Sequence, residues 1–320
     1  MTMSIALVGI GKIARDQHVP ALQSSSDWTL AATQSRNGTV EGIESHSDFG
    51  EMLAARPDIE TISLCLPPAP RFDYAMQAMR AGRHVMLEKP PGSTVAECMA
   101  LEAAARENGV SIYATWHSRE AAGVAPARDW LAGKRLKALR IVWKEDARRW
   151  HPGQDWIWEP AGFGIFDPTI NAFSIVTEIL ADPFHVVSGE MAVPENCAMP
   201  SAATLTFSHP HGAEMTADLD FLKEGEQIWR IEIETEEGDL TLSDGGATLT
   251  IDGVEQAGGG DGPDSDDGTN PLLGGEYTRL YAKMAALVRD GRSDFDMTPM
   301  ILTADAFLQS RRRQVAPFEW

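Results

Sequence analysis

Three groups of residues in this 320-residue chain have the types and spacing to do chemistry. Near the start, an apolar run leads into Gly9-x-Gly11-x-x-Ala14. Further along come Glu88-Lys89, followed by two prolines, and Asp167 with Asn171 four residues later. The glycine group is typical of a dinucleotide phosphate site, and lysine and aspartate are groups that donate or accept protons.

The glycine motif lies between a predicted strand and a predicted helix, which is the context that a dinucleotide site requires. Gly9 would allow the tight turn, Gly11 would let the backbone approach a pyrophosphate, and Ala14 would let the helix pack near the strand. The N–H groups at the start of that helix would face the phosphates. We therefore predict cofactor contacts from Gly9, Gly11, Lys12 and Ile13, in preference to an ordinary glycine-rich turn.

The end of the second predicted strand indicates which dinucleotide is preferred. An NAD-specific site usually has an acidic residue there, but this chain has Ser35 and Arg36. These two can hydrogen-bond and neutralise a 2′-phosphate, which predicts NADP as the preferred cofactor and leaves NAD possible. A solvated turn is the alternative. After the third strand, Leu66 and Pro67 are predicted to form a wall of the same site.

A parallel sheet would bring these groups to one edge. Up to residue 118, short apolar strands alternate with amphipathic helices, as βαβ units require. Strands are predicted near residues 4–9, 28–33, 60–65, 83–87 and 111–115, and helices near 12–24, 48–55, 70–81 and 94–108. We predict a doubly wound α/β Rossmann domain over residues 1–118, which binds its ligands at the carboxyl ends of the strands.

Residues 119–320 have a different pattern, which predicts a second, α+β domain with a largely antiparallel open sheet. The expected elements are a helix near 120–132, strands over 138–143, 185–193, 203–208, 215–221 and 228–251, and helices over 276–290 and 300–313. An open sheet would expose a face that needs covering, and a homodimer is one solution. The acidic, glycine-rich residues 258–268 are expected to form a solvated linker rather than a calcium loop.

Composition narrows the class of protein. A net charge of −20 argues against nucleic acid or an acidic membrane surface as partner. No apolar run is long enough to span a bilayer and the chain start has no signal-peptide pattern, so a cytoplasmic location is expected. The three cysteines match neither a disulfide framework nor a zinc site, and we expect no metal.

The segment from Met86 to Pro91, Met-Leu-Glu-Lys-Pro-Pro, resembles the signature of the Gfo/Idh/MocA family of NAD(P)-dependent sugar and polyol oxidoreductases. The resemblance implies that Lys89 points at the substrate hydroxyl beside the nicotinamide and that Glu88 lies near the cofactor. The alternative for this pair is an exposed strand end. The resemblance covers essentially the whole chain.

The family pattern has Asp-x-x-x-His where this chain has Asp167-x-x-x-Asn171. Asp167 has the place of an N-cap before Pro168, so capping alone is an alternative explanation for the aspartate. An amide cannot take a proton at neutral pH, so the role of base passes to Asp167, Lys89 or water, with Asp167 preferred. With Asn171 at this position and the tryptophan-rich residues 143–160, the chain resembles the group of D-galactose and L-arabinose 1-dehydrogenases.

By this resemblance, the residues that line a sugar site are Lys89, His117, Glu145, Asp167 and Asn171, with Trp150 and His151 as further walls. Taken without it, His117 is as well explained as a structural residue and Glu145 as a surface acid. The implied reaction is oxidation of the anomeric carbon of an aldopyranose to the aldonolactone. A non-catalytic sensor of NAD(P) and sugar, or a dehydrogenase for another polyol or a dihydrodiol, are the alternatives.

Overall fold

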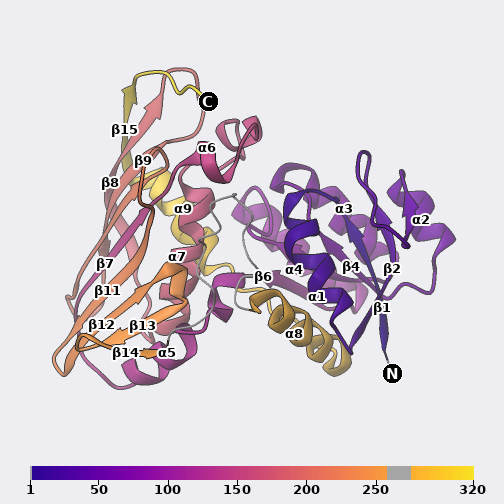
Figure 1. The fold of residues 1–320 in the computed structure, drawn as a ribbon, viewed down its shortest axis with the longest axis horizontal. Coiled ribbons are helices and arrows are strands. Elements are labelled where there is room, and N and C mark those ends of the chain that lie inside the picture. Colours follow the sequence, from indigo (N-terminus) through magenta and orange to yellow (C-terminus); the bar gives the residue numbers. More distant parts are fainter. Residues whose placement is uncertain (1, 258–274) are drawn as a thin grey trace. The chain divides into compact units, whose positions relative to one another are not determined.

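The computed structural model describes residues 2–257 and 275–320 (Figure 1). The chain forms two compact units, one of Met1–His117 with Gly275–Met297 and one of Ser118–Gly274 with Thr298–Trp320. The main division lies within one residue of the predicted boundary. A single boundary at that point nevertheless misassigns residues 275–297, which pack with the first unit. The predicted acidic linker over 258–268 lies outside the described residues.

The first unit contains a six-stranded parallel sheet with the order β3-β2-β1-β4-β5-β6. The strands in this order are Glu44–His46, Trp28–Gln34, Met3–Val8, Thr61–Leu64, His84–Glu88 and Ile112–Thr115. β4 and β6 are buried along their whole length, because helices cover both faces of the sheet. The five predicted strands are confirmed, and the short β3 is an addition. The strand order reverses beside β1, where doubly wound sheets bind their ligands.

The helices of this unit lie close to their predicted positions. They are the π-helical turn η1 (Ala14–His18), α1 (Val19–Gln23), α2 (Phe49–Ala55), α3 (Pro68–Arg80), α4 (Val95–Asn108) and α8 (Glu276–Asp290). Thr94 begins α4 by accepting a hydrogen bond from the backbone N–H of Glu97, and Gly109 ends it in the left-handed conformation. Although α8 comes from near the chain end, it packs beside α1 (Figure 1).

The second unit contains a nine-stranded sheet with the order β14-β13-β12-β11-β7-β10-β9-β8-β15. In this order the strands are Val254–Ala257, Thr248–Ile251, Gly238–Ser243, Ile228–Thr235, Leu136–Lys144, Glu214–Asp220, Ala202–Ser208, His185–Pro194 and Ser310–Val315. Two of the pairings, β7 with β10 and β8 with β15, are parallel, and the others are antiparallel. Three helices pack on this sheet: α5 (Val124–Leu131), α7 (Phe166–Ile179) and α9 (Thr298–Gln309).

The predicted helix over residues 300–313 is wrong in its last turn. α9 ends at Gln309, and the next six residues form β15, which pairs in parallel with β8. This strand contains three consecutive arginines and lies at the end of the strand order. Charged side chains are common on edge strands, where they discourage pairing with another chain.

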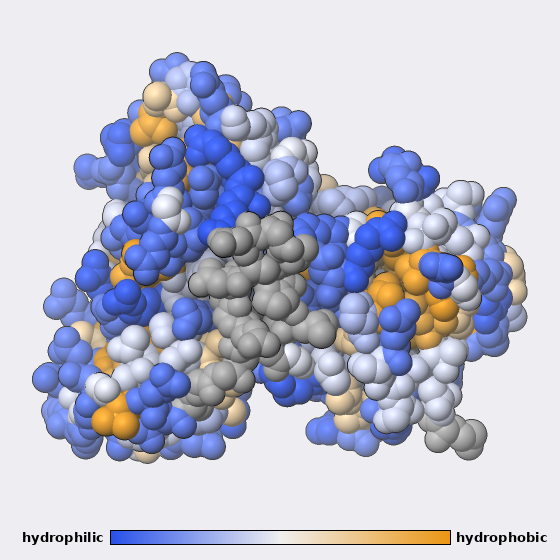
Figure 2. Space-filling model, in the orientation of Figure 1, coloured by the Kyte–Doolittle hydropathy of each residue, from blue (hydrophilic) through white to orange (hydrophobic). Residues whose placement is uncertain are grey.

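The face of this sheet away from the helices is polar. Arg140, Thr204 and Thr206 are exposed there, and Lys144 forms an ion pair of 2.6 Å with Asp218. This face therefore has no need of an apolar cover, and the homodimer stays a prediction. Much of the molecular surface in view in Figure 2 is likewise hydrophilic, as the net charge of −20 suggests. Within the described part of the chain, no helix is long and apolar enough to cross a membrane.

Candidate active site

The glycine turn after β1 has the shape that a dinucleotide phosphate requires. Gly9 has a φ of +88°, and a Cβ there would come within 2.8 Å of the Cδ2 atom of Leu66 and 3.1 Å of its backbone N. Gly11, in contrast, has no atom within 4 Å of the place where a Cβ would lie, so its backbone is open to a ligand. Ala14 is fully buried. The residues present therefore fit a bound pyrophosphate.

Two other predicted cofactor residues follow in this turn. Lys12 is exposed, and its Nζ lies 2.5 Å from Asp16, one turn further along the helix. Ile13 is half-buried. The Lys12 ammonium therefore lies at the surface next to Gly11, where it could reach a phosphate bound at the glycine turn.

The turn after β2 brings the predicted 2′-phosphate residues together. The Ser35 hydroxyl accepts a hydrogen bond from the backbone N–H of Asn37 at 3.4 Å, and Arg36 is exposed beside it. Sequence reasoning missed a second guanidinium here: Nη1 of Arg15 donates to the Thr39 carbonyl at 3.1 Å. The sequence could have indicated this guanidinium, since Arg15 lies one helical turn after Gly11.

A buried arginine joins the ends of β4 and β5. Arg71, on α3, is 2% exposed, and its Nε donates to the carbonyl of Leu66 at 3.0 Å. The same guanidinium donates to the carbonyls of Glu88 and Pro90. It thus holds the backbone on both sides of Lys89 and next to Pro67. An arginine within a helix looks like a surface residue in the sequence, so nothing there marked it.

Glu88, at the end of β5, is 5% exposed and surrounded by donors of the protein itself. Its Oε1 accepts from the Tyr277 hydroxyl at 2.8 Å and from Nε2 of His18 at 3.1 Å, and its Oε2 accepts from the backbone N–H of Lys89 at 3.0 Å. Burial would raise the pKa of this carboxyl, but the hydrogen bonds and charge of His18, with His117 and Tyr277, lower it to about 2. The cofactor contact predicted for Glu88 stays a prediction.

His18 is fully buried, and each of its ring nitrogens has a partner. Nδ1 lies 2.7 Å from the Tyr281 hydroxyl, and Nε2 lies 3.1 Å from Oε1 of Glu88. A ring that donates from both nitrogens is charged. Burial would lower the pKa of His18, but Cys65, Tyr281 and Glu88 raise it well above 6.5. His18 and Glu88 therefore form a buried ion pair.

At the end of β6, His117 begins the short 3-10 helix η2 (His117–Glu120). Its Nδ1 lies 2.8 Å from Oε2 of the buried Glu276, and its ring stacks on Tyr277 with centroids 5.7 Å apart. Glu276 and Tyr277 are the first two residues of α8. Sequence reasoning missed both, because only the fold brings them to the strand ends.

In the second unit, Glu145 follows β7 and is 6% exposed. Its Oε2 accepts from the Trp229 indole N–H at 2.6 Å. Trp150, the last residue of α6 (Ala147–Trp150), meets Trp229 edge-on with ring centroids 5.5 Å apart and donates to Gln227 at 3.3 Å. A carboxylate beside two indole rings can bind a sugar, which offers hydroxyls to acceptors and C–H groups to rings. Trp229 and Gln227 are further residues that sequence reasoning missed.

Asp167 is 3% exposed near the start of α7. The helix begins at Phe166 with Ile165 at the N-cap, so the predicted N-cap position of Asp167 is wrong and capping does not explain this buried acid. Its Oδ2 lies 3.6 Å from Nε2 of His151. Asn171, one turn later, is half-buried. The second unit therefore brings an acid, an imidazole and an amide to one end of α7.

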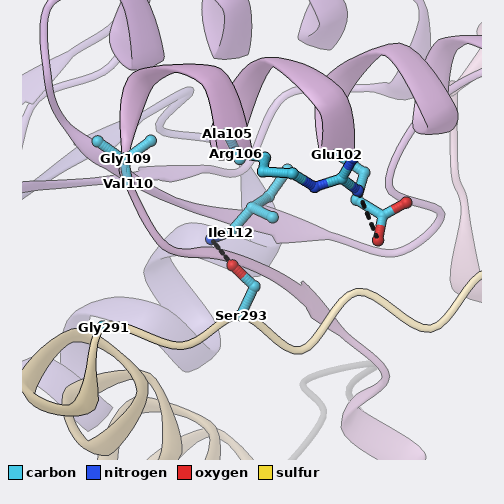
Figure 3. A pocket seen from close by; sticks show the side chains of 8 residues that line it. All are labelled: Glu102, Ala105, Arg106, Gly109, Val110, Ile112, Gly291 and Ser293. Atoms are coloured by element: carbon cyan, nitrogen blue, oxygen red, sulfur yellow. Dashed lines mark hydrogen bonds and ion pairs between the residues drawn. The ribbon is translucent and has the colours of Figure 1, made fainter.

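A pocket of about 300 Å³ lies elsewhere in the first unit (Figure 3). Glu102 and Arg106 of α4, Gly109 and Val110 after that helix, and Ser293 line it. Because these residues flank the beginning of β6, the pocket is at the amino-terminal edge of the sheet, opposite the glycine turn. Among the described residues, no cluster of histidine, cysteine or acidic side chains could hold a metal ion.

Comparison with known proteins places the chain in a family. Residues 3–115 match the model of the Gfo/Idh/MocA oxidoreductase family, described as having an NAD-binding Rossmann fold. Galactose 1-dehydrogenase from Pseudomonas fluorescens is 39% identical over 326 residues, which cover 98% of each chain. This protein belongs to the Gfo/Idh/MocA oxidoreductase family.

Solved structures of other proteins support the same assignment. The crystal structure of a D-galactose-1-dehydrogenase protein from Rhizobium etli is 43% identical and has a TM-score of 0.91, covering 99% of this chain and 98% of its own. A 3-ketoreductase from Actinomadura kijaniata, in complex with NADP, has a TM-score of 0.82 at 15% identity, over 98% of this chain and 100% of its own. At that identity the likeness shows the fold alone. As a member of the family, this protein is an oxidoreductase with an NAD(P)-binding Rossmann domain.

Proposed function

We propose that this protein is an NADP-preferring aldose 1-dehydrogenase, which oxidises the anomeric carbon of an aldopyranose to the aldonolactone. Two relatives named as galactose 1-dehydrogenases, 39% and 43% identical, match this chain over nearly its whole length. The observation that carries the proposal is the buried acid Asp167 with His151 at 3.6 Å, in a unit that also presents Glu145 and two indoles.

In this proposal the cofactor is held by the edge of the first unit. The backbone at Gly9, Gly11 and Ile13 and the ammonium of Lys12 would contact the pyrophosphate, with Leu66 and Pro67 as a wall. Ser35 and Arg36 would bind the 2′-phosphate, and the proximity of Arg15 to the same turn supports NADP over NAD. Bound NADP would supply the acceptor for the hydride that leaves C1.

The protein residues then have to orient the sugar and take one proton. Asp167 is the proposed base for the hydroxyl on C1, because Asn171 cannot accept a proton at neutral pH. Lys89 and His117 would hold the substrate oxygens, and a cation beside the reacting hydroxyl stabilises developing alkoxide character. Glu145, Trp150 and His151 would bind the remaining hydroxyls and the C–H face of the ring.

The proposed substrates are sugars that share one arrangement of ring hydroxyls. D-galactose, L-arabinose and D-fucose agree at C2 to C4 and differ in the substituent at C5. A site that hydrogen-bonds each hydroxyl rejects an epimer strongly, because its own polar groups would be left unpaired. It rejects a missing CH₂OH group only weakly. We therefore expect all three sugars to be used.

The test is reduction of NADP or NAD, followed by absorbance, with a panel of aldoses and with inositol and a dihydrodiol as controls. We expect turnover with the three named sugars, faster with NADP. Lys89→Met should abolish turnover and leave NADP binding intact, whereas Lys137→Met, at an exposed site on β7, should change neither. NADP binding without turnover on any aldose would contradict the proposal and leave a sensor or another substrate.

A further inference from the structure

Two neighbouring residues of α8 each bind a different strand end of the first unit. The Tyr277 hydroxyl donates to Glu88 at the end of β5, and the Glu276 carboxylate binds Nδ1 of His117 after β6. Tyr277 also stacks on the His117 ring. The first turn of α8 is therefore in contact with both segments that present Lys89 and His117.

Glu88 is hydrogen-bonded to the backbone of Lys89. One carboxylate oxygen accepts from Tyr277 and His18, and the other accepts from the backbone N–H of Lys89. The orientation of the carboxylate thus sets the orientation of the Lys89 peptide group. Since Tyr277 and His18 are both buried with Glu88, the carboxylate has little room to turn.

The contact of Glu276 sets the hydrogen-bonding state of His117. An ionised carboxylate only accepts hydrogen bonds, so Nδ1 of the ring carries the proton of the 2.8 Å bond. Any hydrogen bond between this ring and a sugar oxygen is then made by Nε2. The stacking on Tyr277 fixes the plane in which Nε2 points.

We propose that Glu276 and Tyr277, together with the buried His18, are positioning residues that hold His117 and Lys89 for catalysis. None of the three needs to contact the substrate for this role. The inference rests on the proposed function, because it assumes that Lys89 and His117 bind substrate oxygens. A displacement of about 1 Å at such groups is enough to reduce turnover by roughly 100-fold.

The variants that test this are Tyr277→Phe, which removes a hydrogen bond to Glu88, and Glu276→Gln, which replaces the anionic acceptor of the His117 bond by a neutral amide. Both keep the size of the side chain. Tyr74→Phe is the matched control, because Tyr74 belongs to α3 and its ring packs on Phe49. We expect kcat to fall about 10- to 100-fold in both variants, with the KM for NADP within about 2-fold of the parent. Glu276→Asp should recover part of the activity lost in Glu276→Gln.

A merely structural role would lower activity by inactivating a fraction of the molecules. That loss would leave KM and the isotope effect with C1-deuterated sugar unchanged. Mispositioning slows the hydride-transfer step itself, so the isotope effect on kcat should rise towards its intrinsic value. An unchanged isotope effect, or unchanged kcat, in both variants would overturn the proposal.

A second measurement does not depend on turnover. Hydrogen exchange at the Lys89 amide, which donates to Glu88, should be about 10-fold faster in Tyr277→Phe and unchanged in Tyr74→Phe. Unchanged exchange in Tyr277→Phe would overturn the role of Tyr277. If the parent protein oxidises no aldose, the proposed function fails, while this exchange result still decides whether α8 holds the Lys89 backbone.

Discussion

The buried pair of His18 and Glu88 makes a prediction whose size follows from the structure. In the folded chain the pKa of Glu88 falls from 4.5 to about 2, which corresponds to about 3 kcal/mol of stability when the carboxyl is ionised. Breaking a buried pair by removing one partner typically costs about 3–5 kcal/mol. Because Tyr277 and the Lys89 amide still donate to Glu88, we expect His18→Gln to cost about 3 kcal/mol, the lower end of that range.

The loss of stability in His18→Gln should depend on pH, in opposite directions at acidic and at alkaline pH. The pKa of Glu88 is lowered, so its contribution to the free energy of unfolding is present above pH 4.5 and is lost as pH falls towards 2. The pKa of His18 is raised, so its contribution is full below pH 6.5 and is lost as pH rises through the raised value. The difference in stability between the parent and His18→Gln should therefore be largest between pH 4.5 and 6.5 and should narrow on both sides.

The assay is urea unfolding at a series of pH values, with the free energy of unfolding of the first unit as the readout. His46→Gln is the matched control, because His46 forms a pair of the same kind with Glu44 at 2.9 Å, where the glutamate is 48% exposed. An exposed pair contributes about 1 kcal/mol or less. If His18→Gln costs no more than His46→Gln at pH 6, or if its cost does not vary with pH, the buried ion pair is wrongly assigned.

Three further predictions concern the cofactor, the backbone and the base. Arg36→Ala should lower the preference for NADP over NAD by about 10-fold or more in kcat/KM, as losing a charge-assisted bond to a 2′-phosphate implies; an unchanged ratio would remove Arg36 from that role. Arg71→Met should destabilise the first unit by about 3 kcal/mol or more in urea unfolding, because buried carbonyls lose their donor. Asp167→Asn should lower kcat by about 100-fold or more, with NADP affinity kept; a fully active variant would pass the role of base to Lys89 or water.

The positions of three predicted groups at strand ends follow from the order of the chain. The glycine turn, Ser35-Arg36 and Glu88-Lys89 each end a strand of a parallel sheet, and such ends meet at one edge whatever the rest of the chain does. The fold class and the five main strands were predictable for the same reason. The error at residues 310–313 arose because an arginine run has no apolar period that distinguishes strand from helix.

The residues that sequence reasoning missed are those whose partners are remote in the chain. Tyr277 is 189 residues from Glu88, and Trp229 is 84 residues from Glu145. No local pattern marks such a pair, because burial and geometry arise only once the tertiary structure exists. Arg71 shows the same limit within a short span, since its helix gives no sign that the guanidinium is buried. Residue types and their spacing in the sequence therefore indicate candidate catalytic residues more readily than the remote residues that position them.

The return of α8 to the first unit also bears on how the strand ends become ordered. The chain leaves this unit after His117 and re-enters it at Gly275, so Glu88 and His117 lack their α8 partners until the later segment has docked. A buried carboxylate such as that of Glu88 is costly unless its hydrogen-bond partners are present. Residues 1–118 alone contain the six strands of this sheet but lack Glu276 and Tyr277. The edge that presents Lys89 is therefore a property of two distant segments, and residues 1–118 alone lack the α8 partners of this edge.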